Sequence, residues 1–187
     1  SSVGERGSVN EEPPAEEHAS KRAKVGSGRR RRADPLEAAA DESDSAHRDA
    51  LEAAAELESD DVEMQVYAAG VIKEAALKTE LAEDVVEALA GALSDDDAQV
   101  RTFVAMALAA AATRSELTSD AIRALARATV DDDQGDVRCY AAEAIGSAAR
   151  KRALSNDTIE ALKRACSDEV PCVRGAARHA LDKIPDA

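Results

Sequence analysis

Cysteine and histidine, the side chains most able to bind metals or act as nucleophiles, are few and scattered in this 187-residue chain. The cysteines are Cys139, Cys166 and Cys172, and the histidines are His18, His47 and His179. Cys172 and His179 would share a face of one helix, but together with Cys166 they match no structural zinc spacing. Three irregularly spaced cysteines also fit reduced thiols better than a disulfide framework. We therefore predict no metal site here.

Two acidic runs, residues 95–97 and 131–133, are the next candidates, because carboxylates bind hydrated cations. Neither run has the ligand order or the glycine of an EF-hand loop. An Asp that precedes a helix caps it and complements its dipole, so a solvated turn explains both runs. The chain also has no glycine-rich phosphate loop and no Ser or Cys in a recognisable partnership with a His and an acid. We predict no catalytic or cofactor-binding residues.

One segment reverses the charge of an acidic chain, which has 38 acidic and 24 basic residues and a net charge of -14. This basic cluster consists of Lys21, Arg22, Lys24, Arg29, Arg30, Arg31 and Arg32. Three uses stay open: contact with an acidic protein surface, which we rank first, then nucleic-acid binding, then a bipartite nuclear-import signal with a short linker. No aromatic residue interleaves the arginines, so stacking on bases is not expected.

Composition divides the chain into two regions. Residues 1–45 hold three of the five prolines and almost no branched apolar residues, and we interpret them as a disordered tail. In residues 46–187, abundant alanine and few aromatic residues require a core of closely packed helices, which argues against a β-sandwich. The longest apolar run, residues 104–112, is about half the length that a membrane-spanning helix needs. We therefore predict no membrane span.

The second region is a fourfold repeat with a period of about 36 residues. Each copy opens with an Asp before an apolar helical stretch, at Asp49, Asp84, Asp120 and Asp157. An acidic turn leads to a second stretch that begins at Met64, Val100, Val137 and Val173. The three aromatic residues, Tyr67, Phe103 and Tyr140, fall in one column, which we assign to the core stripe. The pattern predicts an all-α protein, an α-solenoid of four two-helix repeats at about 46–80, 81–115, 116–152 and 153–187.

These units resemble HEAT-like repeats, in particular the short class called phycobilisome-lyase HEAT-like repeats, over about residues 46–184. The likeness lies in the turn Asp, the Val-Arg pair that opens the second helix and the Ala-Ala-x-Ala-Leu continuation. It implies a ladder of ion pairs between successive repeats, formed here by Asp95, Arg101, Asp132, Arg138, Asp168 and Arg174. The first repeat has Ser59 and Gln65 instead, as expected of a capping repeat without a predecessor.

The resemblance specifies an architecture and leaves the activity open. Deoxyhypusine hydroxylases have a similar repeat layout but hold two irons with His-Glu pairs, and no His-Glu dipeptide occurs in this sequence. That activity is excluded. Bilin lyases share the repeats as well, but the resemblance brings no diagnostic residue that this sequence can test. A bilin lyase-like protein is therefore the third and lowest alternative.

The surface that we expect to bind a partner is the second-helix strip. It contains the residues offset from the core stripe: Val66, Gly70, Lys73, Thr102, Met106, Ala109, Cys139, Glu143, Gly146, Gly175, His179 and Asp182. Its side chains are small and lightly charged, which favours a shallow groove for a peptide or helix. The alternative explanation is that short side chains merely reflect an alanine-biased genome.

The sequence thus predicts a non-enzymatic protein-protein interaction scaffold or adaptor in the cytoplasm, with another protein as partner. The alternative is a nucleic-acid-associated accessory protein that acts through the basic cluster, nuclear if the source is eukaryotic. The excess of Asp and Glu resembles the composition of proteins from salt-loving archaea, in which net charge keeps proteins soluble at high salt. A GC-rich genome is the other explanation of this composition.

Overall fold

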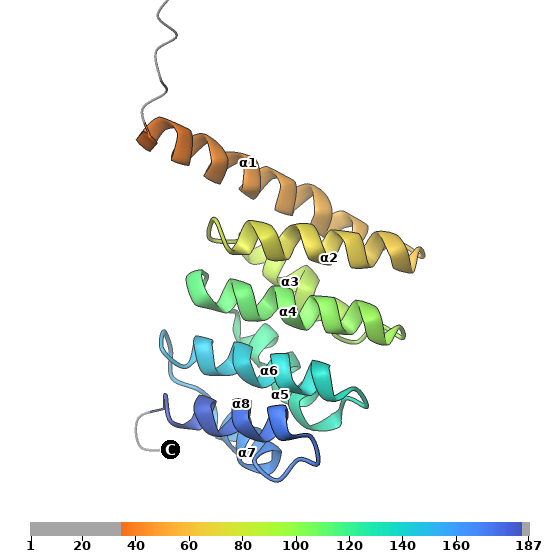
Figure 1. The fold of residues 1–187 in the computed structure, drawn as a ribbon, viewed down its shortest axis with the longest axis vertical. Coiled ribbons are helices and arrows are strands. Elements are labelled where there is room, and N and C mark those ends of the chain that lie inside the picture. The colour runs from red at the N-terminus through yellow and green to blue at the C-terminus, as the bar shows by residue number, and fades with distance from the viewer. Residues whose placement is uncertain (1–34, 185–187) are drawn as a thin grey trace, which may run out of the picture. The chain divides into compact units, whose positions relative to one another are not determined.

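The structure is a computed structural model, and it describes residues 35–184, all of whose regular structure is helical (Figure 1). The helices are α1 (Pro35–Glu56), α2 (Val62–Ala76), α3 (Glu83–Ala92), α4 (Ala98–Arg114), α5 (Ser119–Asp131), α6 (Gly135–Ala148), α7 (Asn156–Ala165) and α8 (Pro171–Leu181). They form four two-helix repeats, so the prediction of an all-α solenoid is confirmed. The basic cluster and the rest of residues 1–34 lie outside the described residues.

The repeats are arranged in two layers of helices. The second helices stack in order, α2 on α4, α4 on α6 and α6 on α8, and this layer faces the viewer in Figure 1. The first helices α3, α5 and α7 pack against their own second helices and, through α5, against one another. Each helix therefore contacts its own repeat and the adjacent repeats, as in other repeat proteins.

Small side chains allow the second helices to approach closely. On α4 and α6, fully buried positions are held by Ala105, Ala107, Ala141 and Ala144. A close approach of backbones occurs at Gly146 on α6, where a Cβ atom would lie 2.9 Å from the Cα of Ala180 on α8. Alanine and glycine thus replace large apolar side chains as the means of packing this core.

Helix α1 begins earlier than the sequence predicts. The tail was assigned to residues 1–45, but residues 35–45 are the first three turns of α1. A proline is tolerated in the first turn of a helix, and the Leu, Glu and Ala residues that follow Pro35 are strong helix formers. Ser43 donates a hydrogen bond to Thr79 across 3.0 Å, which attaches this early part of α1 to the end of the first repeat. The boundary at residue 46 is therefore wrong.

The acidic turns begin the second helices. Asp61 caps α2, and Asp97 caps α4 by accepting hydrogen bonds from the backbone N–H groups of Gln99 and Val100. The second acidic run differs, because the N-cap residue of α6 is Gln134 and makes no side-chain cap. In that turn Asp132 instead accepts from the N–H of Gln134 and pairs with an arginine of the preceding repeat.

Candidate binding surfaces

A ladder of ion pairs runs along the turns inside the repeats. Arg101 on α4 donates from Nε and Nη2 to the two carboxylate oxygens of Asp132, at 2.8 and 3.2 Å. Arg138 on α6 binds Asp168 in the same way, at 2.7 and 3.0 Å. Each guanidinium also donates from Nη1 to a carbonyl oxygen of its own turn. Each arginine therefore links two successive repeats, and the aspartates that it binds have a structural role.

The two ends of the ladder depart from this pattern. In the first repeat, Gln65 takes the place of the arginine and donates to the carboxylate of Asp95 at 2.9 Å. Gln65 is thus part of the ladder, although the repeat pattern in the sequence indicated only that the first repeat departs from it. In the last repeat, Arg174 donates to the carbonyl oxygens of Asp168 and Glu169, and no carboxylate between residues 35 and 184 lies within ion-pair distance of it.

The ion pairs of the ladder are largely buried, and they shift the pKa values of their side chains. The side chains of Arg138 and Asp168 are 8% and 11% exposed. The hydrogen bond from Arg138 holds the pKa of Asp168 below its ordinary value, against the opposing effect of burial. The same interaction raises the pKa of Arg138. Both groups are therefore charged at neutral pH, and they stabilise one another.

The second-helix strip is not uniform along the stack. Its members on α2 and α4 are half-buried: Val66, Gly70, Lys73, Thr102, Met106 and Ala109. On α6 only Glu143 is exposed, whereas Cys139 and Gly146 are buried. The prediction that these two face outward is wrong, because α8 covers them. The members at α8, Gly175, His179 and Asp182, are exposed.

The strip is hollowed at the first repeat. An opening of about 620 Å³ lies between α1, α2 and α4 and is lined by Val66, Gly70 and Lys73 of the strip. Tyr67 and Phe103 line it as well. The aromatic column was assigned to the core, but Tyr67 is 70% exposed and Phe103 is half-buried. The assignment is wrong for Tyr67, whereas Phe103 and Tyr140 do pack against the core. Tyr67 and Phe103 thus place two aromatic side chains at the opening.

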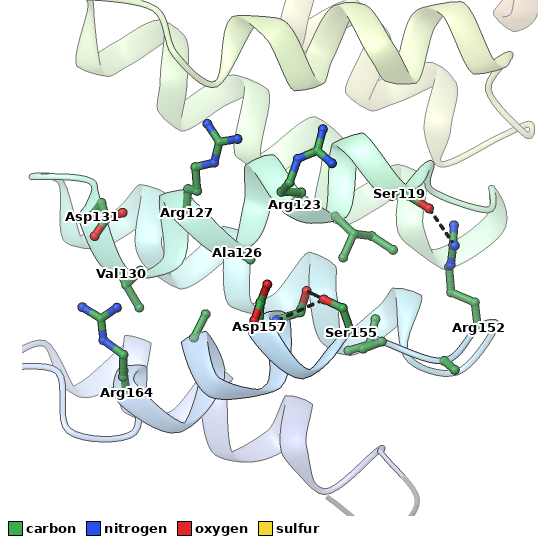
Figure 2. A pocket seen from close by; sticks show the side chains of 15 residues that line it. Ser119, Arg123, Ala126, Arg127, Val130, Asp131, Arg152, Ser155, Asp157 and Arg164 are labelled. Atoms are coloured by element: carbon green, nitrogen blue, oxygen red, sulfur yellow. Dashed lines mark hydrogen bonds between the residues drawn. The ribbon is translucent and has the colours of Figure 1, made fainter.

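A second hollow lies in the layer of first helices. A crevice of about 750 Å³ separates α5 from α7 and is bounded by the loop before α7. Four arginines line it, and Figure 2 shows Arg164 on α7 extending toward α5, whereas Arg123 and Arg127 extend from α5 away from α7. Arg152 lies on the loop before α7. The binding residues predicted from the sequence all lie on the second helices or in the basic cluster, so this crevice was not predicted. The signal available was the pair of arginines at 123 and 127, one helical turn apart.

The three cysteines differ in their exposure to solvent. Cys139 is buried between α6 and α8, Cys166 is half-buried and Cys172 is exposed. Burial, with a contribution from neighbouring Cys172, raises the pKa of the Cys139 thiol to about 12, so this thiol is not a nucleophile at neutral pH. No three His, Cys, Asp or Glu side chains within residues 35–184 lie close enough together to hold a metal ion.

Comparison with known proteins identifies the fold. No family model and no curated protein matches the chain. Among solved structures, an engineered protein aligns with 70% of this chain and 60% of its own, at 22% identity and a TM-score of 0.54. A designed armadillo repeat protein in complex with the peptide (KR)4 aligns with 71% of this chain and 63% of its own, at 18% identity and a TM-score of 0.55. The chain thus spans less than two thirds of these structures.

Identities this low show the fold alone, and the fold is that of a helical-repeat protein. Such folds carry their functions on surfaces that vary from one protein to the next. No helix within residues 35–184 is long and apolar enough to cross a membrane.

Proposed function

We propose that the chain is a non-enzymatic protein-interaction scaffold of the HEAT-like class, which binds a peptide or helix of another protein on its second-helix strip. The observation that carries this proposal is the opening between α1, α2 and α4, which exposes Tyr67 beside Val66 and Gly70. Exposed aromatic rings beside a shallow apolar surface are typical of binding hot spots. The designed armadillo protein that binds (KR)4 supports the proposal as a repeat fold with a peptide ligand.

Other exposed large apolar side chains occur in the same repeat. In the described part of the chain, Leu51, Val62, Met64, Tyr67 and Leu77 are the large apolar residues that remain exposed. All five belong to α1, α2 or the residue after α2. An apolar surface concentrated in one repeat marks that repeat as the part of the strip that contributes most to affinity.

Gly70 offers a test that leaves the fold intact. A Cβ atom at Gly70 would meet nothing within 4 Å, so Gly70→Arg places a long side chain across the opening without a clash. Peptides selected from a random library against the full chain should bind the Gly70→Arg variant at least about tenfold more weakly. Gly91→Arg on α3 is the matched control, because a Cβ there also meets nothing within 4 Å.

Equal binding to the wild type and Gly70→Arg would contradict the proposal. If Gly70→Arg and Gly91→Arg weaken peptide binding equally, the added positive charge and not its position causes the loss. Gly175→Arg on α8, at another open position, tests whether the binding surface extends to the fourth repeat. We expect little change there, since the exposed apolar residues lie in the first repeat.

A further inference from the structure

We propose that the crevice between α5 and α7 is a second binding site, and that it accepts a short amphipathic segment whose acidic side chains pair with Arg127 and Arg164. This site lies on the first helices, so it does not depend on the second-helix strip. Its volume, about 750 Å³, is within the range of small-ligand and peptide-anchor pockets.

The first helices become less acidic along the stack. Helix α3 carries Glu83, Asp84 and Glu87 and no basic residue. Helix α5 carries two arginines and two aspartates, and α7 carries two basic and two acidic residues, so neither has a net charge. The crevice itself is lined by four arginines and two aspartates, so its lining has a net charge of +2 in a molecule whose net charge is -14. Such a local reversal attracts an acidic partner to one place on an otherwise repulsive surface.

Two of the four arginines that line the crevice have no partner for their guanidinium donors within residues 35–184. Arg123 pairs with Asp120 at 2.7 Å, and Arg152 donates to the carbonyl oxygen of Leu117 and to the hydroxyl of Ser119. Arg127 and Arg164 make no ion pair or side-chain hydrogen bond with any other residue between 35 and 184. Figure 2 shows Arg164 on α7 extending toward α5, near Val130, whereas Arg127 extends from α5 away from α7 and must change rotamer to meet a ligand in the crevice. Their guanidinium groups are available to carboxylates.

The crevice also has an apolar floor. Ile122, Ala126 and Ala161 are at most 9% exposed and line it from both helices. The half-buried side chains of Val130 and Leu154 extend the lining. An acidic ligand without apolar groups would leave this apolar surface exposed to water. The combination therefore fits a segment that has carboxylates on one side and aliphatic side chains on the other.

The lining favours a peptide over a nucleic acid. None of its residues is aromatic, so bases have no ring to stack on. Asp131 and Asp157 also line the crevice and would repel closely spaced phosphates. A peptide can place its few carboxylates away from these two acids.

Three fluorescent peptides of about twelve residues, long enough for three helical turns, test this inference. The first contains Glu and Leu at amphipathic helical spacing, the second has Lys for Glu, and the third has Ser for Leu. We expect the full chain to bind only the first well. The double variant Arg127→Glu with Arg164→Glu should weaken that binding by about tenfold or more, and high salt should weaken wild-type binding as well.

Arg48→Glu with Arg178→Glu is the matched control, because it makes the same change of charge at exposed positions outside the crevice. This control should bind the Glu-Leu peptide within about twofold of the wild type, apart from weak long-range effects. Gly70→Arg should leave the binding unchanged, which separates this site from the proposed strip. Equal losses in both double variants would overturn the inference, as would equal binding of the Glu-Ser peptide. A single-stranded DNA probe that binds more tightly and depends on Arg127 and Arg164 would also overturn it.

Discussion

At the scale of single residues, two glycines in the second helices have opposite roles. A Cβ atom at Gly146 would lie 2.9 Å from Cα and Cβ of Ala180, and the backbone atom cannot move without shifting α8. We expect Gly146→Ala to lower the free energy of unfolding by about 1–3 kcal/mol. At Gly175 a Cβ atom meets nothing within 4 Å. Gly175→Ala should therefore raise it by about 0.5–1 kcal/mol through helix propensity.

Chemical denaturation of the two variants beside the wild type checks this pair. Both changes add one methyl group to a helical glycine, so a difference in sign isolates the contact with Ala180. Two changes of the same sign would show that the close approach of α6 and α8 does not limit stability.

The ladder makes a second prediction for individual side chains. Arg138→Ala leaves the nearly buried carboxylate of Asp168 without its bidentate partner and should cost about 2–4 kcal/mol. Lys163→Ala removes an ion pair with Glu160 whose side chains are 49% and 66% exposed. That change should cost less than about 0.5 kcal/mol, so urea titration should separate the two. Comparable costs would mean that the ladder contributes no more than a surface pair.

The ladder also predicts how stability depends on pH. Because Arg138 holds the pKa of folded Asp168 below its ordinary value near 4, the folded protein binds fewer protons than the unfolded chain in that range. The contribution of Asp168 is thus complete above pH 5 and is lost as the pH falls through the folded pKa. The stability difference between the wild type and Asp168→Asn should therefore be constant from about pH 7 to 5 and shrink below about pH 4. A difference that stays constant to pH 3 would contradict this.

At the scale of secondary-structure elements, the residue at which α1 begins can be tested by mutation. Asp44 lies in the interior of α1 if the helix begins at Pro35, but outside it if the helix begins near residue 46. Asp44→Pro removes an N–H donor and clashes with the preceding turn, so it should unwind residues 35–43. Circular dichroism should show a loss of about nine helical residues, and amide exchange should quicken around Ser43. Asp44→Ala is the control and should keep the helix; an unchanged helix content in Asp44→Pro would refute the early start.

The sequence and the structure agree most where the repeat itself carries the information. The spacing of Asp49, Asp84, Asp120 and Asp157 located the four repeats, because each repeat must present the same faces to its neighbours. Spacing was less informative about exposure. It gives the side of a helix on which Cys139 or Tyr67 lies, but not how closely the next helix approaches. Helix α8 buries Cys139, whereas no described helix covers Tyr67.

At the scale of the whole molecule, the net charge of -14 predicts a dependence on salt. The ladder brings the acidic turns of successive repeats to one edge of the stack, where exposed acids such as Glu58, Asp60 and Asp96 repel one another. Salt at 1 M shortens the screening length to about 3 Å and removes most of this repulsion. We expect the Tm of the wild type to rise by about 5 °C between dilute buffer and 1 M KCl.

A triple variant separates this repulsion from other effects of salt. Glu58→Gln, Asp60→Asn and Asp96→Asn remove three exposed charges whose side chains make no hydrogen bond or ion pair within the described residues, and they leave the ladder in place. The variant should have a higher Tm than the wild type in dilute buffer and gain less from KCl, because it has less repulsion to screen. If both proteins gain equally, salt acts by strengthening apolar burial, and the acidic edge does not limit the stability of the stack.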